Sequence, residues 1–161
     1  MTGQTGADDA LMKSFGDEVI GMISCCPYSL DAETESNKRF IDGMQKNFQA
    51  EPGFYAAGLY ITCMVIDAAL AKSGGKTDDK EDLMKTLKSV SLEDTPRGPV
   101  KFDRFGNAVG NFFIRRAEKV GGKLINKTIK IYPNVSQFWT YDEKTFLQQP
   151  VYSRDFPPLK S

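Results

Sequence analysis

Residues 52–75, PGFYAAGLYITCMVIDAALAKSGG, decide how the chain is organised. Proline and glycine open the stretch, mostly apolar residues follow, and two glycines close it, which is the pattern of one α-helix. A helix that is apolar all round is expected to be buried on most sides. A membrane span needs about 20 residues without charges, and this run is shorter and carries Asp67. We therefore expect the central helix of a layered α/β core, with Phe54 and Tyr55 reaching a functional edge.

The composition is that of a globular protein with one core. The chain has 161 residues, of which 40% are hydrophobic and 26% are charged. Lys plus Arg and Asp plus Glu both number 21, so no net charge attracts nucleic acid or an anionic membrane surface. We expect a small molecule or a protein as partner, with no nucleic acid and no direct membrane insertion.

Several classes of catalytic site are excluded by residue type. The sequence contains no histidine, which removes Ser-His and Cys-His catalysis and most zinc sites. No glycine-rich dinucleotide or phosphate loop is present. The acidic pairs at residues 8–9 and 78–79 stand at predicted helix starts, where the helix dipole explains them better than catalysis does. We expect no enzyme activity, no cofactor and no metal site.

The cysteines give no disulfide framework. Cys25, Cys26 and Cys63 form no CxxC pair, and their number is odd. The simplest interpretation is small buried side chains in a strand and a helix. A reactive thiol would need a lowered pKa, and the local sequence supplies no cation for it.

The elements before the central helix follow from local patterns. Residues 8–15 form a predicted short helix with acids in its first turn. Residues 19–26, VIGMISCC, are an apolar run without alternation, typical of a strand buried on both faces in a parallel sheet. Asp31 is the expected cap of a helix over residues 32–49.

The second half changes from helices to strands. An Asp78-x-x-Glu81 capping pattern begins a predicted helix over residues 78–90. Residues 103–107 form a predicted hairpin turn, and two strands, 111–120 and 123–132, follow with Gly-Gly between them. In the second strand isoleucines lie on one face and Asn, Thr and Lys on the other. The tail after Pro133 is expected to drape over a surface as an ordered extension.

Candidate binding residues stand at the ends of these elements. Ligands of open α/β sheets bind at strand ends and in the adjoining loops. Tyr28 and Tyr55 can wall an apolar pocket there, or they can simply fill gaps at the core edge. The full set of candidates comprises Gln4, Thr5, Cys26, Tyr28 and Tyr55.

The order of these pieces resembles a known family. GDEVIGMISCCPYSLD, the central helix, and RGPVKFDRFGNAVGN after a capped helix are together similar to the C-terminal part of bacterial solute-binding proteins of ABC transporters. The type is that of the branched-chain amino acid (Leu/Ile/Val-binding) proteins. The tail, IYPNVSQFWTYDEKTFLQQPVYSRDFPP, resembles a subset with aromatic-acid ligands.

The resemblance implies the C-terminal portion of a type I periplasmic-binding-protein fold, with two Rossmann-like lobes joined by a hinge. The chain would then be a fragment. Residues 1–28 would be the end of the second lobe plus the hinge strand. Residues 29–110 would be the C-terminal part of the first lobe, and 111–161 the return strands and tail.

The resemblance also implies site residues. Gln4 falls where amino-acid binders place an acid against the ligand's ammonium, and a neutral amide there argues against a plain amino acid. Tyr55 falls where the family places an aromatic ring, and Tyr28 lies in the hinge. Residues that grip the ligand's carboxylate are expected upstream of Met1.

We therefore expect the solute-binding component of an ABC transporter, which takes up a small organic acid together with a membrane permease. A periplasmic location is implied by the resemblance alone, since residues 1–9 lack the features of a signal peptide. An alternative is a ligand-sensing regulatory domain of the same fold that acts on a signalling partner. A carboxylate-based hydrolase is the third possibility, and the missing catalytic spacing disfavours it.

Overall fold

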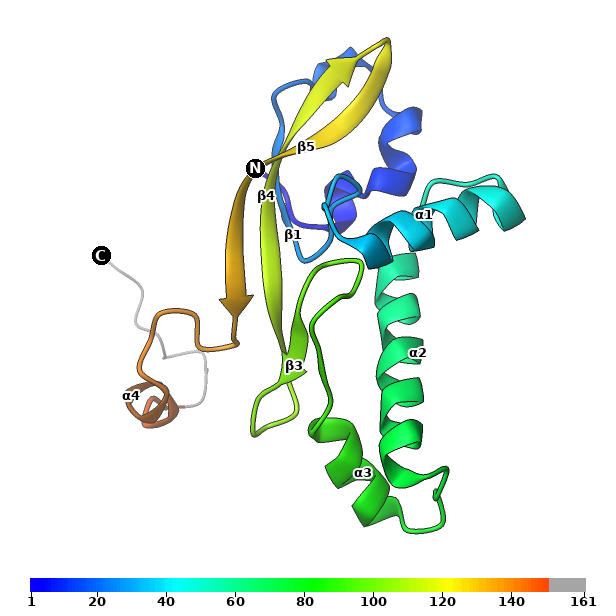
Figure 1. Ribbon diagram of the computed structural model, residues 1–161. Coiled ribbons are helices and arrows are strands. Elements are labelled where there is room, and N and C mark those ends of the chain that lie inside the picture. The colour runs from blue at the N-terminus through cyan, green and yellow to red at the C-terminus, as the bar shows by residue number, and fades with distance from the viewer. Residues whose placement is uncertain (151–161) are drawn as a thin grey trace.

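The computed structural model describes residues 1–150 and consists of a long antiparallel sheet with helices beside it (Figure 1). Three short 3-10 helices come first, then a strand, three α-helices, four strands and a last short helix. In chain order these are η1 (Thr5–Ala7), η2 (Asp9–Ser14), η3 (Asp17–Val19), β1 (Ile23–Cys26), α1 (Glu35–Phe48), α2 (Phe54–Ser73), α3 (Lys80–Lys88), β2 (Ser91–Leu92), β3 (Val100–Phe102), β4 (Ala108–Val120), β5 (Lys123–Val135) and α4 (Glu143–Leu147).

Strand β4 is the centre of the sheet. It pairs with β5 along almost its whole length, and on its other edge it pairs with β3 and then with β1. The turn between β4 and β5 is Gly121-Gly122, both with positive φ, which suits glycine. The two predicted strands and their Gly-Gly turn are thus confirmed, and both strands are longer than predicted.

Strand β1 differs from its prediction. It covers only Ile23–Cys26, and residues 17–19 before it form η3. It pairs with β4 in the antiparallel direction, and its parallel contact is a single bridge between Thr2 and Ser24. Its side chains alternate between buried and half-buried, so the prediction of a strand buried on both faces of a parallel sheet was wrong.

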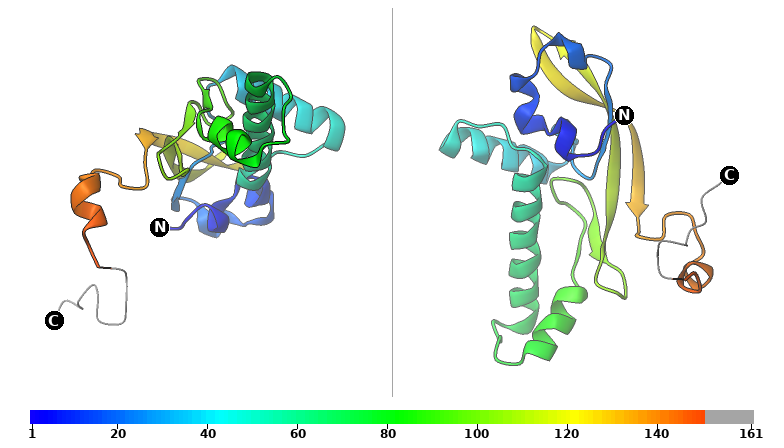
Figure 2. Two further views of the ribbon diagram at one scale, coloured as in Figure 1. Left: turned by 90° about the horizontal axis from the view of Figure 1, so that it is seen from below. Right: turned by 180° about the vertical axis from the view of Figure 1, so that it is seen from behind.

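Helix α2 is the predicted central helix, but only one side of it is buried. Ala57, Ile61 and Val65 follow one another at intervals of four and face the protein. On the opposite side Leu59 is 71% exposed, so the expectation of burial on most sides was wrong. Figures 1 and 2 show why, since α3 and β3 lie on one side of α2 and α1 crosses its first turn. With 20 residues, α2 is long and apolar enough to cross a membrane by length and composition alone, a test that core helices of soluble proteins also pass.

Two groups of buried side chains form the core, and α2 contributes to both. The first group lies against α3 and the short strands, and the second lies where β1 ends and α1 begins. Their members are Ile61, Val65, Ala69, Val90 and Val100 in the first, and Cys26, Tyr28, Phe40 and Ala57 in the second. Helix α2 therefore links the core around α3 and β3 to the core where β1 ends and α1 begins.

The helix starts depend on caps that differ from the predicted ones. The Oγ1 atom of Thr34 accepts a hydrogen bond from the backbone N–H of Asn37 at 3.0 Å, so α1 begins at Glu35 rather than at residue 32. Asp31 instead accepts from the backbone N–H of Thr128 on β5 at 2.9 Å. Likewise α3 is capped by Asp79 and not by the predicted Asp78. Residues 9–14, predicted as part of a short helix, form a 3-10 helix.

The segment after β5 leads away from the sheet (Figure 2). The predicted turn at residues 103–107 is present, with Gly106 at φ +87°, and the segment contacts this turn. Gln137 donates to an Asp103 oxygen at 2.6 Å, and the rings of Phe105 and Phe138 are 5.9 Å apart. The tail therefore projects beside a turn rather than draping over the body, and residues 151–161 of it lie outside the described residues.

Candidate ligand-binding site

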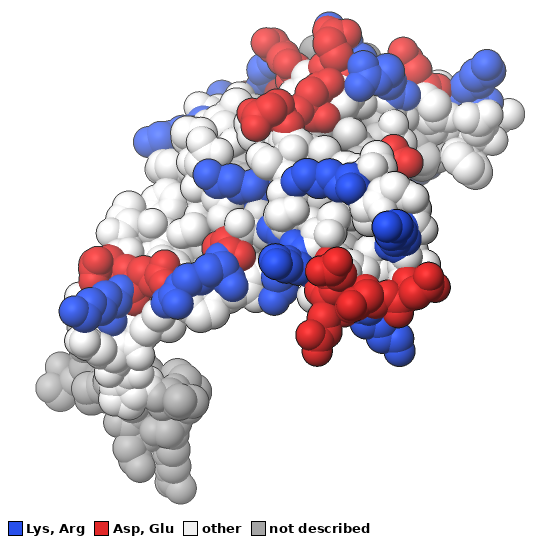
Figure 3. Space-filling model, turned by 60° about the horizontal axis from the view of Figure 1, so that its bottom comes forward, with Lys and Arg blue, Asp and Glu red and all other residues white. Residues whose placement is uncertain are grey.

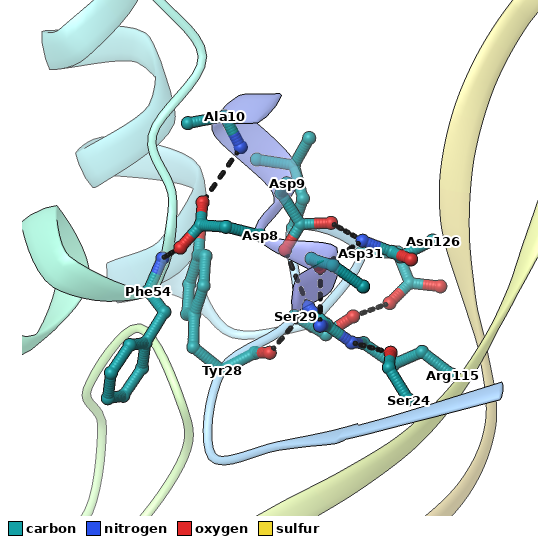
Figure 4. Close-up of polar contacts among 12 residues, drawn as sticks. Asp8, Asp9, Ala10, Ser24, Tyr28, Ser29, Asp31, Phe54, Arg115 and Asn126 are labelled. Atoms are coloured by element: carbon teal, nitrogen blue, oxygen red, sulfur yellow. Dashed lines mark hydrogen bonds and ion pairs between the residues drawn. The ribbon is translucent and has the colours of Figure 1, made fainter. Parts of the chain in front are cut away.

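The opening loop, the turn after β1 and the first residue of α2 meet at one junction (Figure 4). Asp8 connects two of them. Its Oδ1 atom accepts from the backbone N–H of Ala10 at 2.9 Å, and Oδ2 accepts from that of Phe54 at 3.0 Å. A Cβ on Gly53 would lie 1.7 Å from the Asp8 Oδ1 atom, so any larger residue there would displace this carboxylate. Asp8 thus supplies a carboxylate to the first backbone N–H of α2 and satisfies that donor from within the chain.

A buried ion pair joins the opening loop to β4. The side chains of Arg115 and Asp9 are 0% and 2% exposed, and Arg115 Nη1 lies 2.8 Å from Asp9 Oδ2. Arg115 also donates to the backbone oxygens of Tyr28 and Ala7, at 3.1 and 2.9 Å, and to the hydroxyl of Ser24 at 3.2 Å. One guanidinium therefore holds together the loop, strand β1 and the turn after it.

Asp9 is further tied to β5. Its Oδ1 atom accepts from Asn126 Nδ2 at 2.9 Å, and the same nitrogen donates to the backbone oxygen of Ala7 at 2.9 Å. Burial raises the pKa of Asp9 to about 6 against the attraction of Arg115, so the carboxyl group is ionised at neutral pH. The predicted helix start at residues 8–9 is confirmed, with Asp8 as the cap of η2 and Asp9 in its first turn, and Asp9 in addition pairs with Arg115.

The turn after β1 is fixed by a second acid. Asp31 accepts hydrogen bonds from the Ser29 hydroxyl at 2.8 Å and from the backbone N–H of Thr128 at 2.9 Å. Partial burial alone would raise the pKa of Asp31, but the hydrogen bonds from Thr128 and Ser29 outweigh it and lower the pKa. Both ends of the turn are thus held by charged groups that stay ionised at neutral pH.

Tyr28 lies at the centre of the junction. Its side chain is buried, its hydroxyl donates to Asn37 Oδ1 at 3.1 Å, and its ring meets that of Phe40 edge to face at 6.3 Å. Burial raises the pKa of the Tyr28 hydroxyl above its ordinary value, so it remains a neutral donor. The hydroxyl is therefore hydrogen-bonded to α1, while the ring can still line a cavity.

An apolar groove of about 470 Å³ opens between α2 and β3 next to this junction. A pocket of this size is in the range that holds small organic ligands. Within residues 1–150 its wall contains aromatic rings at one end, aliphatic side chains along α2 and β3, one arginine, and no acidic residue. The lining residues are Pro27, Tyr28, Phe54, Ala57, Gly58, Ile61, Thr62, Val65, Ile66, Leu87, Arg97, Val100, Phe102 and Ala108.

The structure brings together some of the predicted site residues. Tyr28 lines the groove, and Cys26 is buried in the same core group. Gln4 is half-buried and Thr5 exposed in the opening loop, and neither contributes to the groove wall. Tyr55 is 62% exposed and packs on the ring of Phe54 at 5.2 Å, outside that wall. The binding roles of all five stay predictions.

Three polar residues of the junction and the groove escaped the sequence analysis. Arg115 follows three apolar residues of β4 and stands next to Arg116, and Asn126 is one of the polar residues of β5. Arg97 stands between Pro96 and Gly98 in a segment with many charges, so nothing in the sequence singles it out. The sequence does not separate Arg115 from the exposed Arg116 beside it, so no local signal pointed to a buried charge at this position.

The cysteines and acids offer no metal site in the described part of the chain. No group of three or more metal-ligating side chains occurs among residues 1–150. Cys26 is buried and burial raises the pKa of its thiol to about 11, so it stays protonated. Cys25 is half-buried and Cys63 is exposed, so the prediction of three buried thiols was wrong for Cys63.

Solved structures similar to this chain are solute-binding proteins. One from an ABC transporter of Rhodopseudomonas palustris BisB5, in complex with 3,4-dihydroxybenzoic acid, is 35% identical with a TM-score of 0.74, and the match covers 80% of this chain and 35% of that one. Another from R. palustris, in complex with 4-hydroxybenzoate, is 27% identical with a TM-score of 0.70, with the same coverage. An ABC transporter substrate-binding protein from Sphaerobacter thermophilus shares the fold, with 23% identity and a TM-score of 0.76, over 82% of this chain and 36% of that one.

The matches cover most of this chain but only part of each solved structure. The chain spans about a third of the length of the solved structures it matches, which confirms the expectation of part of a larger mixed α/β fold. No curated protein matches it. A family profile described as periplasmic binding protein matches residues 1–123. The resemblance found in the sequence is therefore confirmed, and the chain belongs to the periplasmic binding protein family.

Proposed function

We propose that this chain is part of the solute-binding component of an ABC transporter and binds a small aromatic carboxylic acid. The groove beside Tyr28 is the observation that carries the proposal, because its aromatic and aliphatic wall suits a ring-shaped apolar body. The relatives in complex with 3,4-dihydroxybenzoic acid and 4-hydroxybenzoate support the same class of ligand. The family consists of transporter solute-binding proteins rather than enzymes.

The wall of the groove favours an aromatic acid over a plain amino acid. A bound amino acid brings an ammonium group, and a buried ammonium needs a carboxylate partner. The groove has no acidic lining residue, and Gln4 in the opening loop is a neutral amide. A leucine-like ligand would therefore leave its ammonium unpaired, whereas a benzoate carries no positive charge.

The mode of action proposed is that of a soluble receptor for a permease. Residues 1–28 and 111–161 would belong to one lobe and residues 29–110 to the other, with ligand held between them and the closed form recognised by a membrane permease in the periplasm. Figure 3 shows acidic and basic side chains interspersed over the visible face, without a large patch of one sign. This mixed surface fits a protein partner better than nucleic acid.

Ligand-dependent stability tests the proposal. The chain is melted alone and with 3,4-dihydroxybenzoate, 4-hydroxybenzoate, benzoate or leucine. A ligand at about 100 times its dissociation constant adds about 2.7 kcal/mol to the free energy of unfolding. We expect the benzoates to raise the melting temperature and leucine to leave it unchanged. A rise with leucine alone, or with none of the four, would refute the proposal.

Two adjacent aromatic residues provide a matched pair of variants. Phe54 lines the groove and Tyr55 does not, although the resemblance assigns the ligand contact to Tyr55. If the ligand occupies the groove, Phe54→Ala weakens benzoate binding about tenfold or more, and Tyr55→Ala leaves it within about twofold. The reverse order, measured by titration calorimetry, would place the ligand at the outer side of the helix start.

A further inference from the structure

Arg97 lies in a rigid loop at the wall of the groove. The hydroxyl of Thr95 accepts from the backbone N–H of Arg97 at 3.3 Å and donates to the Gly98 backbone oxygen at 2.6 Å. Gly98 has φ +88°, a conformation that side chains rarely adopt, and a Cβ there would also lie 2.6 Å from Asn111. The loop therefore holds the start of the Arg97 side chain in one place.

The guanidinium of Arg97 is held against β4 by contacts that leave its charge uncompensated. Nη2 donates to the backbone oxygen of Asn111 at 2.6 Å, and the ring of Phe112 lies 5.6 Å from the guanidinium carbon. The group rests on Gly110, where a Cβ would come within 3.1 Å of Nη2. The Nε atom is buried and has no hydrogen-bond partner within residues 1–150.

Arg97 differs from the other arginines in residues 1–150. Each of the others lies within 4 Å of a carboxylate, and no ion pair of the described residues includes Arg97. Burial lowers the pKa of Arg97 to about 10, so the group is still charged at neutral pH. A partly buried cation without a counter-ion is costly, and an anion in the groove would remove that cost. The paired arginines are Arg39, Arg104, Arg115 and Arg116.

We propose that Arg97 binds the carboxylate of the ligand in the groove and makes the site selective for acids over neutral aromatic compounds. This inference rests on the proposed function, and it supplies a carboxylate-binding group within the chain, where the resemblance placed such groups upstream. A guanidinium suits the role because its planar donors match two carboxylate oxygens. Within residues 1–150 the guanidinium donates only from Nη2, so Nη1 is the donor that a carboxylate can use.

Benzoate and benzamide separate the charge from the shape of the ligand. The two have the same ring and nearly the same size, and only benzoate is an anion. With the unmodified chain, calorimetry should give at least tenfold tighter binding of benzoate. Arg97→Gln should weaken benzoate binding about 30-fold or more and change benzamide binding less than threefold, while Arg97→Lys recovers part of the loss. Arg116→Gln changes an exposed arginine that does not line the groove, and it should change neither affinity.

The outcomes distinguish the two proposals. If the unmodified chain binds neither benzoate nor benzamide, the proposed function itself fails. If it binds benzoate and Arg97→Gln binds it equally well, the role of Arg97 is overturned while the function stands. Equal affinity of the unmodified chain for benzoate and benzamide overturns the role of Arg97 without any substitution. That comparison decides the question even if Arg97→Gln does not fold.

Discussion

Replacing Arg115 with methionine tests whether the junction is held by the buried ion pair. The variant keeps much of the side-chain volume but leaves Asp9 buried without its cation, and it removes donors from the backbone oxygens of Ala7 and Tyr28. Breaking a buried pair by removing one partner costs about 3–5 kcal/mol. This is a large share of a typical domain stability of about 5–15 kcal/mol. We expect a corresponding fall in the free energy of unfolding by urea, followed by circular dichroism at pH 7.

A double-mutant cycle shows how much of the loss comes from the orphaned charge. Asp9→Asn removes that charge, so the double variant should be more stable than the sum of the two single losses predicts, by about 1 kcal/mol or more. Arg116→Met is the matched control, because Arg116, the next residue in sequence, pairs with Glu118 at the surface, and such pairs contribute about 0–1 kcal/mol. A loss for Arg115→Met no larger than that of Arg116→Met, or strictly additive single losses, would refute the reasoning.

Three further variants test other parts of the junction. Gly53→Ala should cost about 1–3 kcal/mol, because its Cβ displaces the carboxylate that caps α2, whereas Gly43→Ala on open helix surface should stabilise by about 0.5–1 kcal/mol; urea unfolding checks the opposite signs. Tyr28→Phe should cost about 1–2 kcal/mol, since Asn37 Oδ1 loses its buried donor, and a cost below about 0.3 kcal/mol would contradict that hydrogen bond. Burial raises the pKa of Asp9 from 3.8 to about 6, so its contribution to stability is full below pH 4 and is lost as the pH rises to 6. Asp9→Asn should flatten that part of the profile of unfolding free energy against pH.

Features set by neighbouring residues were predictable from the sequence. The β4–β5 hairpin follows from Gly121-Gly122 between two apolar runs, and the turn at residues 103–107 follows from its Asp, Gly and Asn. Helix α2 follows from its flanking glycines, and its C-cap Gly74 has the expected positive φ. In each case the deciding interaction lies within a few residues along the chain.

Features that depend on distant partners were not predictable. Asp31 and Thr34 are both good capping residues, and Thr34 became the cap because Asp31 is engaged by Thr128, 97 residues away. Asp9 and Arg115 are 106 residues apart, so neither local charge pattern indicated their pairing. Tyr28 was predictable as an edge residue, since it follows the proline that ends β1, but its Asn37 partner was not.

Strand β5 shows why alternation alone does not identify the inner face. The alternation predicts isoleucines on one face and Asn, Thr and Lys on the other, and hydrophobicity would put the isoleucines inside. The prediction is wrong beyond Thr128, because a register shift brings Ile131 opposite Phe113, on the same face as Asn126 opposite Ala117. On that face Asn126 is buried, whereas Ile131 is 48% exposed. Burying an amide is favourable only when its donors are satisfied, and Asn126 Nδ2 meets both Asp9 and the Ala7 backbone oxygen. The inward face of β5 is therefore determined by the opening loop, which the strand's own pattern does not contain. The same dependence explains why the polar junction, rather than the hydrophobic core, is the part of this fold that only the three-dimensional structure could reveal.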